Sequence, residues 1–170
     1  MKIVRTYATS ANLGPGFDAF GICLNLYNEY AFEVSNKYEI NEFNEKYKNP
    51  ENNLIIKSYE KVFNILNKKI IPIKLTELEH NIPTSRGLGS SASCIVSGVM
   101  IANNVLGDIL SIDDVFQIAS DIEGHPDNVA PAIYGDLCAS FMDEKVYSVK
   151  YHASNDLKLL VMIPNFEVST

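Results

Sequence analysis

A glycine- and serine-rich segment, PTSRGLGSSAS at residues 83–93, constrains the fold of this chain more than any other feature. Residues 70–82 before it alternate between apolar and polar, which predicts a strand, and residues 90–106 are apolar on most faces, which predicts a buried helix. Gly87 and Gly89 permit backbone conformations that a side chain would block. Unpaired N–H groups and the positive end of the helix dipole favour an anion at the start of that helix. The segment therefore predicts a strand, a loop and a helix that cradle polyphosphate.

The alternative interpretation of residues 83–93 is an ordinary glycine turn capped by serines. The position between a strand and a helix, together with the run GLGSS, makes the phosphate cradle the stronger interpretation. The pattern GxxxxGK(S/T) is absent from the sequence, so the loop is not of the Walker A type.

Apolar patterns elsewhere predict strands on both sides of a block of helices. Strands are expected over residues 2–9, 136–142, 146–152 and 158–163, with a long strand or a hairpin over 19–35 and a short strand plus a loop over 36–52. Helices are expected over 54–67 with Asn53 as N-cap, over 112–122 with a capping box of Ser111 and Asp114, and over 129–134. This order predicts an α+β or layered α/β fold.

Composition and charge argue against several classes of protein. Hydrophobic residues make up 46% of the chain, enough for a packed core, and the 14 basic against 21 acidic side chains form no basic stripe for nucleic acid. The N-terminus has no apolar signal region, and the longest apolar stretch, residues 95–106, is too short and too polar to span a bilayer. The three scattered cysteines form no CxxC pair and indicate reduced thiols. We therefore expect a cytoplasmic protein that binds neither nucleic acid nor membrane.

A polar turn near the N-terminus carries two candidate binding side chains. Asn12 and Asp18 flank the rigid turn Gly14-Pro15-Gly16, which can aim both side chains at one point. Asp18 offers a carboxylate to a substrate ammonium group, and Asn12 offers both a donor and an acceptor. The alternative is that both side chains only hydrogen-bond their own turn.

A second polar turn, EGHPDN, packs Glu123, His125, Asp127 and Asn128 into six positions. Such a density of polar groups is costly to bury unless a ligand or a metal satisfies it. For His125 taken alone, the alternative is a histidine that caps its loop. As a group, the four residues predict a binding site.

The three segments resemble the motifs of one enzyme superfamily. PTSRGLGSSAS is similar to the central phosphate-binding motif of the GHMP kinases, which include galactokinases, homoserine kinases, mevalonate kinases and phosphomevalonate kinases. ATSANLGPGFD at residues 8–18 and EGHPDNVAPAIYG at residues 123–135 resemble the first and third signatures of the homoserine kinases in particular. The motifs lie in the family's order, and the resemblance covers essentially all 170 residues.

The resemblance implies a fold like the second domain of ribosomal protein S5, an α+β fold with helices packed on one side of a mixed sheet. It implies that residues 1–155 form the GHMP kinase N-terminal domain and that residues 156–170 begin the C-terminal domain, the rest of which is absent. Homoserine kinases are longer, and their second half supplies arginines that grip the substrate carboxylate. This chain has only Arg5 and Arg86. We therefore expect residues 1–170 alone to be inactive.

The implied reaction transfers the γ-phosphate of ATP to the side-chain hydroxyl of L-homoserine and gives O-phospho-L-homoserine for threonine synthesis. The implied ATP-binding residues are those of the central motif: Pro83, Thr84, Ser85, Arg86, Gly87, Leu88, Gly89, Ser90, Ser91, Ala92 and Ser93. Residues 53–55 are expected to border the adenine. The implied homoserine-binding residues are Asn12, Asp18, His125, Asp127 and Asn128.

Two of these residues are candidates for catalytic roles. Asn128 is expected to orient the attacking hydroxyl. Asp127 is the candidate to take its proton, because a carboxylate near the nucleophile is the simplest general base. The homoserine kinase family is, however, thought to manage without a dedicated protein base.

The implied Mg²⁺ ligands are Ser91 and an acid. Counting back from Asn128 by the spacing of some relatives reaches Gln117, which is a poor magnesium ligand. Glu123 is the acid we expect, and Asp121 is the other candidate nearby.

Two other functions remain open from the sequence. One is a different GHMP kinase acting on mevalonate or a sugar, against which the first and third motifs argue. The other is a non-catalytic domain that binds a nucleotide or an amino acid. The small-molecule partners expected are L-homoserine and ATP, and a homodimer is left open.

Overall fold

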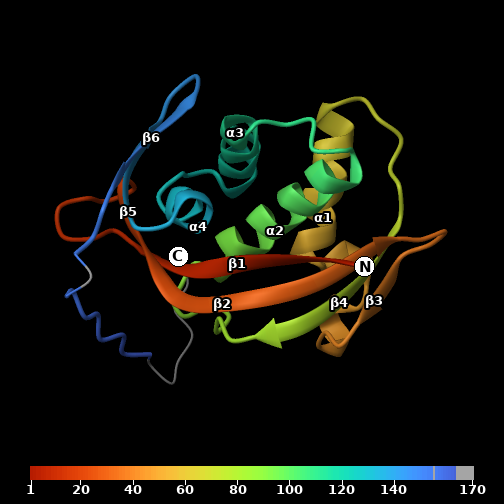
Figure 1. Cartoon of the computed structure of the whole chain (residues 1–170), viewed down its shortest axis with the longest axis horizontal. Coiled ribbons are helices and arrows are strands. Elements are labelled where there is room, and N and C mark those ends of the chain that lie inside the picture. Colours follow the sequence, from red (N-terminus) through yellow and green to blue (C-terminus); the bar gives the residue numbers. More distant parts are fainter. Residues whose placement is uncertain (155, 164–170) are drawn as a thin grey trace.

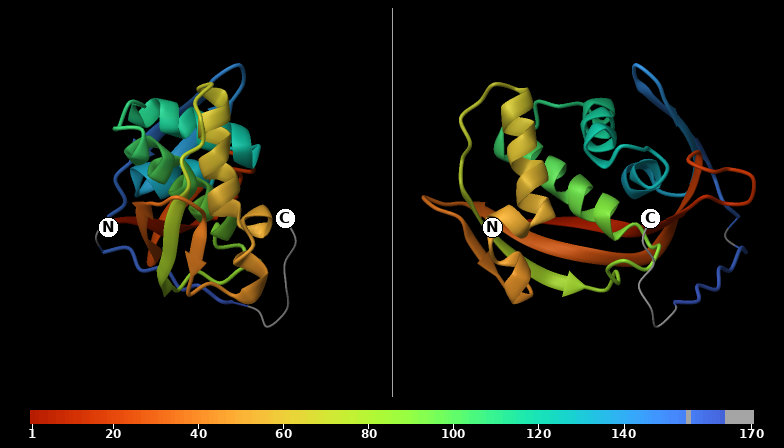
Figure 2. Two further views of the ribbon diagram at one scale, coloured as in Figure 1. Left: turned by 90° about the vertical axis from the view of Figure 1, so that its right-hand side faces the viewer. Right: turned by 180° about the vertical axis from the view of Figure 1, so that it is seen from behind.

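Six strands form one mixed sheet, and four α-helices cover one face of it, in the computed structural model, which describes residues 1–154 and 156–163 (Figure 1; Figure 2). The strands are β1 (Lys2–Ala11), β2 (Phe20–Val34), β3 (Glu39–Asn41), β4 (Ile73–His80), β5 (Leu137–Met142) and β6 (Val146–Tyr151). The helices are α1 (Leu54–Ile65), α2 (Ser90–Val105), α3 (Ile112–Glu123) and α4 (Val129–Tyr134), with short 3-10 helices at Glu45–Tyr47 and Pro50–Asn52. This arrangement confirms the predicted α+β class with helices on one side of a mixed sheet.

Strand β2 lies at the centre of the sheet and pairs antiparallel with β1, β4 and β5. Residues 19–35 therefore contain one long strand and not a hairpin. Strand β3 pairs parallel with β4, and β6 pairs antiparallel with β5, which makes the sheet mixed. The register between β1 and β2 shifts between Tyr7 and Thr9, which marks a β-bulge in β1.

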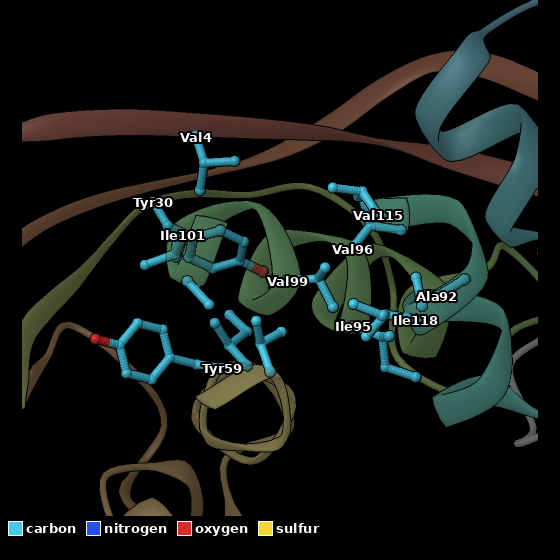
Figure 3. Close-up of a cluster of buried hydrophobic side chains, with 14 of the residues drawn as sticks. Val4, Tyr30, Tyr59, Ala92, Ile95, Val96, Val99, Ile101, Val115 and Ile118 are labelled. Carbon is cyan, nitrogen blue, oxygen red and sulfur yellow. The ribbon is translucent and has the colours of Figure 1, made fainter. Parts of the chain in front are cut away.

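The main core lies between the sheet and the helices (Figure 3). Helix α1 contributes its apolar stripe, including Tyr59 and Val62, while α2 is buried on most of its surface. Gly98 of α2 lies against the backbone of α1, because a Cβ atom there would be 2.3 Å from the carbonyl oxygen of Ile55. The middle of α2 therefore packs in close contact with α1.

The predicted helix starts are confirmed in atomic detail. Asn53 Oδ1 accepts hydrogen bonds from the N–H groups of Ile55 and Ile56, at 3.0 and 3.3 Å. Ser111 and Asp114 form the predicted capping box at the start of α3. The capping residues in the sequence thus correctly predicted where α1 and α3 begin.

One predicted element is wrong. Residues 158–163 form no strand and lie exposed, with Leu160 at 89% and Met162 at 85% of their full accessibility. An apolar segment becomes a strand only where another strand accepts its hydrogen bonds, and no described residue pairs with this one. The start of a second domain at residue 156 stays a prediction, and residues 164–170 of that assignment lie outside the described residues. Within the described part of the chain, no helix is both long enough and apolar enough to cross a membrane.

Candidate active site

A cleft of about 530 Å³ runs along the start of α2 and brings the three predicted segments together. Asn12 directly follows β1, and residues 84–91 form the glycine-rich loop and the first residues of α2. Glu123 is the last residue of α3, and His125 and Asn128 lie in the turn between α3 and α4. Another part of the lining is more apolar and includes Tyr30, Phe43, Tyr47, Leu54 and Cys94. The rings of Tyr30 and Phe43 stack there with centroids 5.9 Å apart, so we call this part the aromatic end. The lining therefore combines a polar end, formed by Asn12, Glu123, His125 and Asn128, with the glycine-rich loop and the aromatic end.

The glycine-rich loop has the backbone that an anion cradle needs. Ser85, Gly87 and Gly89 all have positive φ values, of 56°, 70° and 64°. No side chain caps the first turn of α2, since its N-cap residue is Gly89. Leu88 anchors the loop from below, because its side chain is buried in a small apolar cluster with Ala8 and Ile82. The start of α2 therefore faces the cleft with N–H groups that no side chain caps.

Gly89 is required for a second reason, which is lack of space. A Cβ atom at this position would lie 2.0 Å from Thr9 Oγ1 and 3.1 Å from Asn128 Oδ1. At Gly87, by contrast, a Cβ atom would meet nothing within 4 Å. Only Gly89 thus allows the loop to approach both β1 and the turn before α4.

Ser91 and Glu123 meet at the polar side of the cleft. The Ser91 hydroxyl donates a hydrogen bond of 2.7 Å to Glu123 Oε2. Both residues line the cleft next to the start of α2. Asp121, the other candidate acid, is exposed outside the cleft and accepts a 2.9 Å hydrogen bond from Gln117. Mg²⁺ commonly binds through one or two carboxylates together with water and phosphate oxygens, and a Ser–Glu pair beside a phosphate cradle suits that preference.

The carboxylate of Asp127 organises the turn between α3 and α4. Asp127 is 1% exposed, and its Oδ1 lies 2.6 Å from His125 Nδ1 and accepts a 2.7 Å hydrogen bond from the Asn128 backbone N–H. Gly21 of β2 leaves room for this turn, because a Cβ atom there would lie 1.9 Å from the Asp127 carbonyl oxygen. His125 and Asn128 line the cleft, whereas Asp127 does not. The geometry thus favours Asp127 as a support for its neighbours, and its role as a base stays a prediction.

Asn12 and Asp18 are brought together, with only one of them at the cleft wall. Asn12 Oδ1 accepts a hydrogen bond of 2.8 Å from the Asp18 backbone N–H, and both residues have positive φ values. Among the described residues, no hydrogen bond reaches the Asp18 carboxylate, which is exposed. Asn12 lines the cleft and Asp18 lies outside its lining. The hydrogen bond between Asp18 and Asn12 stabilises the turn. The Asp18 carboxylate takes no part in it and stays close to the polar end of the cleft through Asn12.

Several cleft residues carry no signal in the sequence. Tyr30, Phe43, Tyr47 and Cys94 come from four separate segments and meet only in the folded chain. Burial raises the pKa of the Cys94 thiol to about 12. Asn53, Leu54 and Ile55 were expected at the adenine side, and they line this same end.

The Arg86 guanidinium donates to the carbonyl oxygens of Thr84 and Ser85 and so folds back on its own loop.

Comparison with known proteins finds similarity to one enzyme superfamily. Residues 53–136 match the family model of the GHMP kinases N terminal domain. A homoserine kinase of Clostridium beijerinckii is 44% identical over 172 residues, which is 100% of this chain and 57% of that protein. The chain therefore spans a little over half the length of the curated relatives it matches.

Solved structures agree with the sequence comparison. A Listeria monocytogenes protein assigned to the homoserine kinases superposes with a TM-score of 0.78 and 35% identity, over 88% of this chain and 53% of that one. A homoserine kinase of Cytophaga hutchinsonii superposes with a TM-score of 0.72 and 28% identity, over 88% of this chain and 52% of that one. The glycine-rich loop at the start of α2 lies within the residues that match the family model. The chain is therefore similar to the GHMP kinases, and its residues 53–136 match their N-terminal domain.

Proposed function

We propose that this chain is the nucleotide- and substrate-binding part of a homoserine kinase, which transfers the γ-phosphate of ATP to the side-chain hydroxyl of L-homoserine. The observation that carries the proposal is the convergence on one cleft of the glycine-rich loop, the Ser91–Glu123 pair and the amides of Asn12 and Asn128. The curated relative from Clostridium beijerinckii and the solved structure from Cytophaga hutchinsonii are both named as homoserine kinases, which supports this substrate.

The proposed roles follow from what phosphoryl transfer requires. The reaction needs positioning and charge neutralisation more than covalent chemistry by the protein. The N–H groups of residues 87–91 hold the β- and γ-phosphates at the start of α2. Ser91 and Glu123 hold Mg²⁺, which when bound neutralises charge on the phosphate oxygens. The aromatic end of the cleft takes the adenine.

The acceptor binds at the polar end of the cleft. Asp18 pairs with the ammonium group of homoserine, and Asn12 and His125 hydrogen-bond the same molecule. Asn128 orients the hydroxyl oxygen, which attacks the γ-phosphorus as the bond to the ADP oxygen breaks, and the hydroxyl proton passes to water. Asp127 holds His125 and Asn128 in place through its two short contacts.

A substrate panel tests this function. The full-length gene product should release ADP with L-homoserine and form phosphohomoserine, detected by mass spectrometry, but not with mevalonate or galactose. Turnover of either of those alcohols in place of homoserine would assign the chain to another branch of the superfamily. ATP binding without turnover of any alcohol would indicate a binding domain.

The same proposal covers assembly and location. Residues 1–170 alone should bind nucleotide weakly and form no phosphohomoserine. An arginine usually binds a carboxylate through two hydrogen bonds, and neither Arg5 nor Arg86 matches the arginines that bind the homoserine carboxylate in the family. A place in threonine synthesis in the cytoplasm fits three free cysteines, Cys23, Cys94 and Cys138. Homodimerisation stays a prediction, which sedimentation velocity tests.

A further inference from the structure

Thr9 lies behind the candidate site, between two of its parts. Its hydroxyl donates a hydrogen bond of 2.8 Å to Asn128 Oδ1. Its backbone N–H donates one of 3.2 Å to the carbonyl oxygen of Leu88, inside the glycine-rich loop. The side chain is fully buried and does not line the cleft. Thr9 therefore contacts both the loop and Asn128, and any effect it has on a bound molecule passes through them.

The backbone of β1 is shaped to make this contact. The register between β1 and β2 shifts between Tyr7 and Thr9. A bulge of this kind changes the direction in which the next side chain points and is common beside functional sites. The absence of a side chain at Gly89 then leaves the space in which Thr9 Oγ1 reaches Asn128.

The Asn128 side chain does not cap the helix that follows it. Asn128 is the N-cap residue of α4, where an asparagine oxygen usually accepts a hydrogen bond from the helix backbone. Here its side chain makes no capping hydrogen bond, and Oδ1 is bonded to Thr9 instead. The contact with Thr9 therefore replaces a local stabilising interaction, so another constraint sets the orientation of this amide.

The two ends of the amide can be told apart by their neighbours. Asn128 Nδ2 lies 3.4 Å from Asp127 Oδ1, a favourable arrangement for an NH₂ group beside a carboxylate. The reversed amide would bring two acceptor oxygens together at that distance. The carbonyl end of Asn128 therefore faces Thr9, and the NH₂ end is the one left to serve a bound molecule in the cleft.

We propose that Thr9 is a positioning residue that locks the Asn128 amide so that it presents its NH₂ group, and not its carbonyl oxygen, to the reacting oxygen of the acceptor. Asn128 then donates a hydrogen bond to that oxygen and cannot accept its proton. The inference rests on the proposed kinase function, because it assigns a task to Asn128 in that reaction. It adds a residue of β1 that does not touch the substrate.

The test removes the Thr9 hydroxyl in the full-length gene product and keeps its shape. Thr9→Val should lower kcat for homoserine about tenfold, with KM for ATP and for homoserine changed less than about twofold, since the lost contact acts on orientation and not on binding. Thr9→Ser, which keeps the hydroxyl, should restore kcat. Thr9→Ala gives the same comparison if the valine variant does not fold.

Thr6→Val is the matched control. Thr6 is also a buried β1 threonine, and its hydroxyl hydrogen-bonds with Ser93 and Ser97 of α2, both at 2.8 Å, but it does not contact Asn128. Its loss should lower stability and leave kcat near the wild-type value. An unchanged kcat in Thr9→Val, or an equal fall in Thr6→Val, would overturn the positioning role.

A second measurement does not depend on activity. In protein labelled with ¹⁵N-asparagine, the side-chain NH₂ signals of Asn128, assigned by their loss in Asn128→Ala, should move in Thr9→Val and stay in place in Thr9→Ser and Thr6→Val. If the wild-type protein forms no phosphohomoserine, the proposed function fails, and these signals still decide whether Thr9 holds the amide. Signals that do not move in Thr9→Val refute the inference.

Discussion

The Ser91 hydroxyl donates a 2.7 Å hydrogen bond to Glu123 Oε2, which joins the first turn of α2 to the last residue of α3. The spacing of some relatives pointed to Gln117 in place of an acid. Gln117 instead bonds Asp121 and accepts a 3.1 Å hydrogen bond from the Val146 N–H in β6, so its role is to hold α3 against the sheet. Of the two candidate acids, Glu123 is the one beside the glycine-rich loop.

The Glu123 carboxylate should govern how strongly nucleotide binding depends on Mg²⁺. We expect Glu123→Gln to weaken Mg-ATP binding at least about tenfold, because even the loss of a residue that only supports a metal ligand costs about 10- to 100-fold in metal affinity. ATP binding without Mg²⁺ should change little. Calorimetry with and without the metal measures both. Asp121→Asn is the matched control, and a comparable loss in that variant would move the metal site to Asp121.

Substitutions at Gly87 and Gly89 distinguish the cost of backbone strain from the cost of steric crowding. Both have positive φ values, so alanine at either position should cost about 1 kcal/mol of unfolding free energy. Gly89→Ala should cost about 1–3 kcal/mol more, because its Cβ atom meets Thr9. It should also weaken nucleotide binding more than Gly87→Ala does. Urea denaturation and calorimetry give the two quantities, and equal effects of the two variants would contradict the crowding argument.

Asp18 should affect the acceptor and not the nucleotide. Asp18→Asn removes the charge proposed to pair with the homoserine ammonium group. We expect a loss of about 1.5–3 kcal/mol, roughly one to two decades in kcat/KM for homoserine. The affinity for ATP should stay the same. Asp143→Asn, at an exposed acid in the turn between β5 and β6, controls for the change in net charge. Equal losses for both substrates would indicate a structural role in the turn.

Cys94 should report on occupancy of the aromatic end of the cleft. Burial raises its pKa to about 12, so at pH 8 roughly one thiol in 10⁴ is the reactive thiolate. Alkylation by iodoacetamide should be slow, should rise about tenfold per pH unit below that pKa, and should slow further with Mg-ATP. Cys23, whose pKa burial raises to about 11 and which lies outside the cleft, should show no effect of nucleotide. Peptide mass spectrometry follows each site. An alkylation rate of Cys94 that is the same with and without Mg-ATP would show that the aromatic end of the cleft is not part of the ATP site.

Elements with a strong local signal could be predicted from the sequence. The caps at Asn53 and Ser111, the amphipathic stripe of α1 and the glycine-rich loop all depend on residues close together in the chain. The three polar segments could also be identified, and they do border one cleft. What their side chains bind is a prediction that the substitutions above test.

The remaining parts could not be predicted, for physical reasons. The strand expected at 158–163 depends on a pairing partner, and an apolar pattern does not say whether one is present. The cleft wall at Phe43 and Tyr47 comes from an irregular polar segment that joins the site only through packing. In the sequence Thr9 looks like any other residue of a β-strand. Its partner Asn128 lies 119 residues further along the chain, so no local pattern indicates the contact.

The separation between Thr9 and Asn128 sets when the cleft can form during synthesis. They are 119 residues apart, so at about 5–20 residues per second the ribosome delivers the second roughly 6–24 s after the first. Strands β1 and β2 can pair early, but β2 also needs β5, which follows Asn128. Such long-range pairing slows folding. A nucleotide can stabilise only the finished domain, so it cannot assist the nascent chain through this interval.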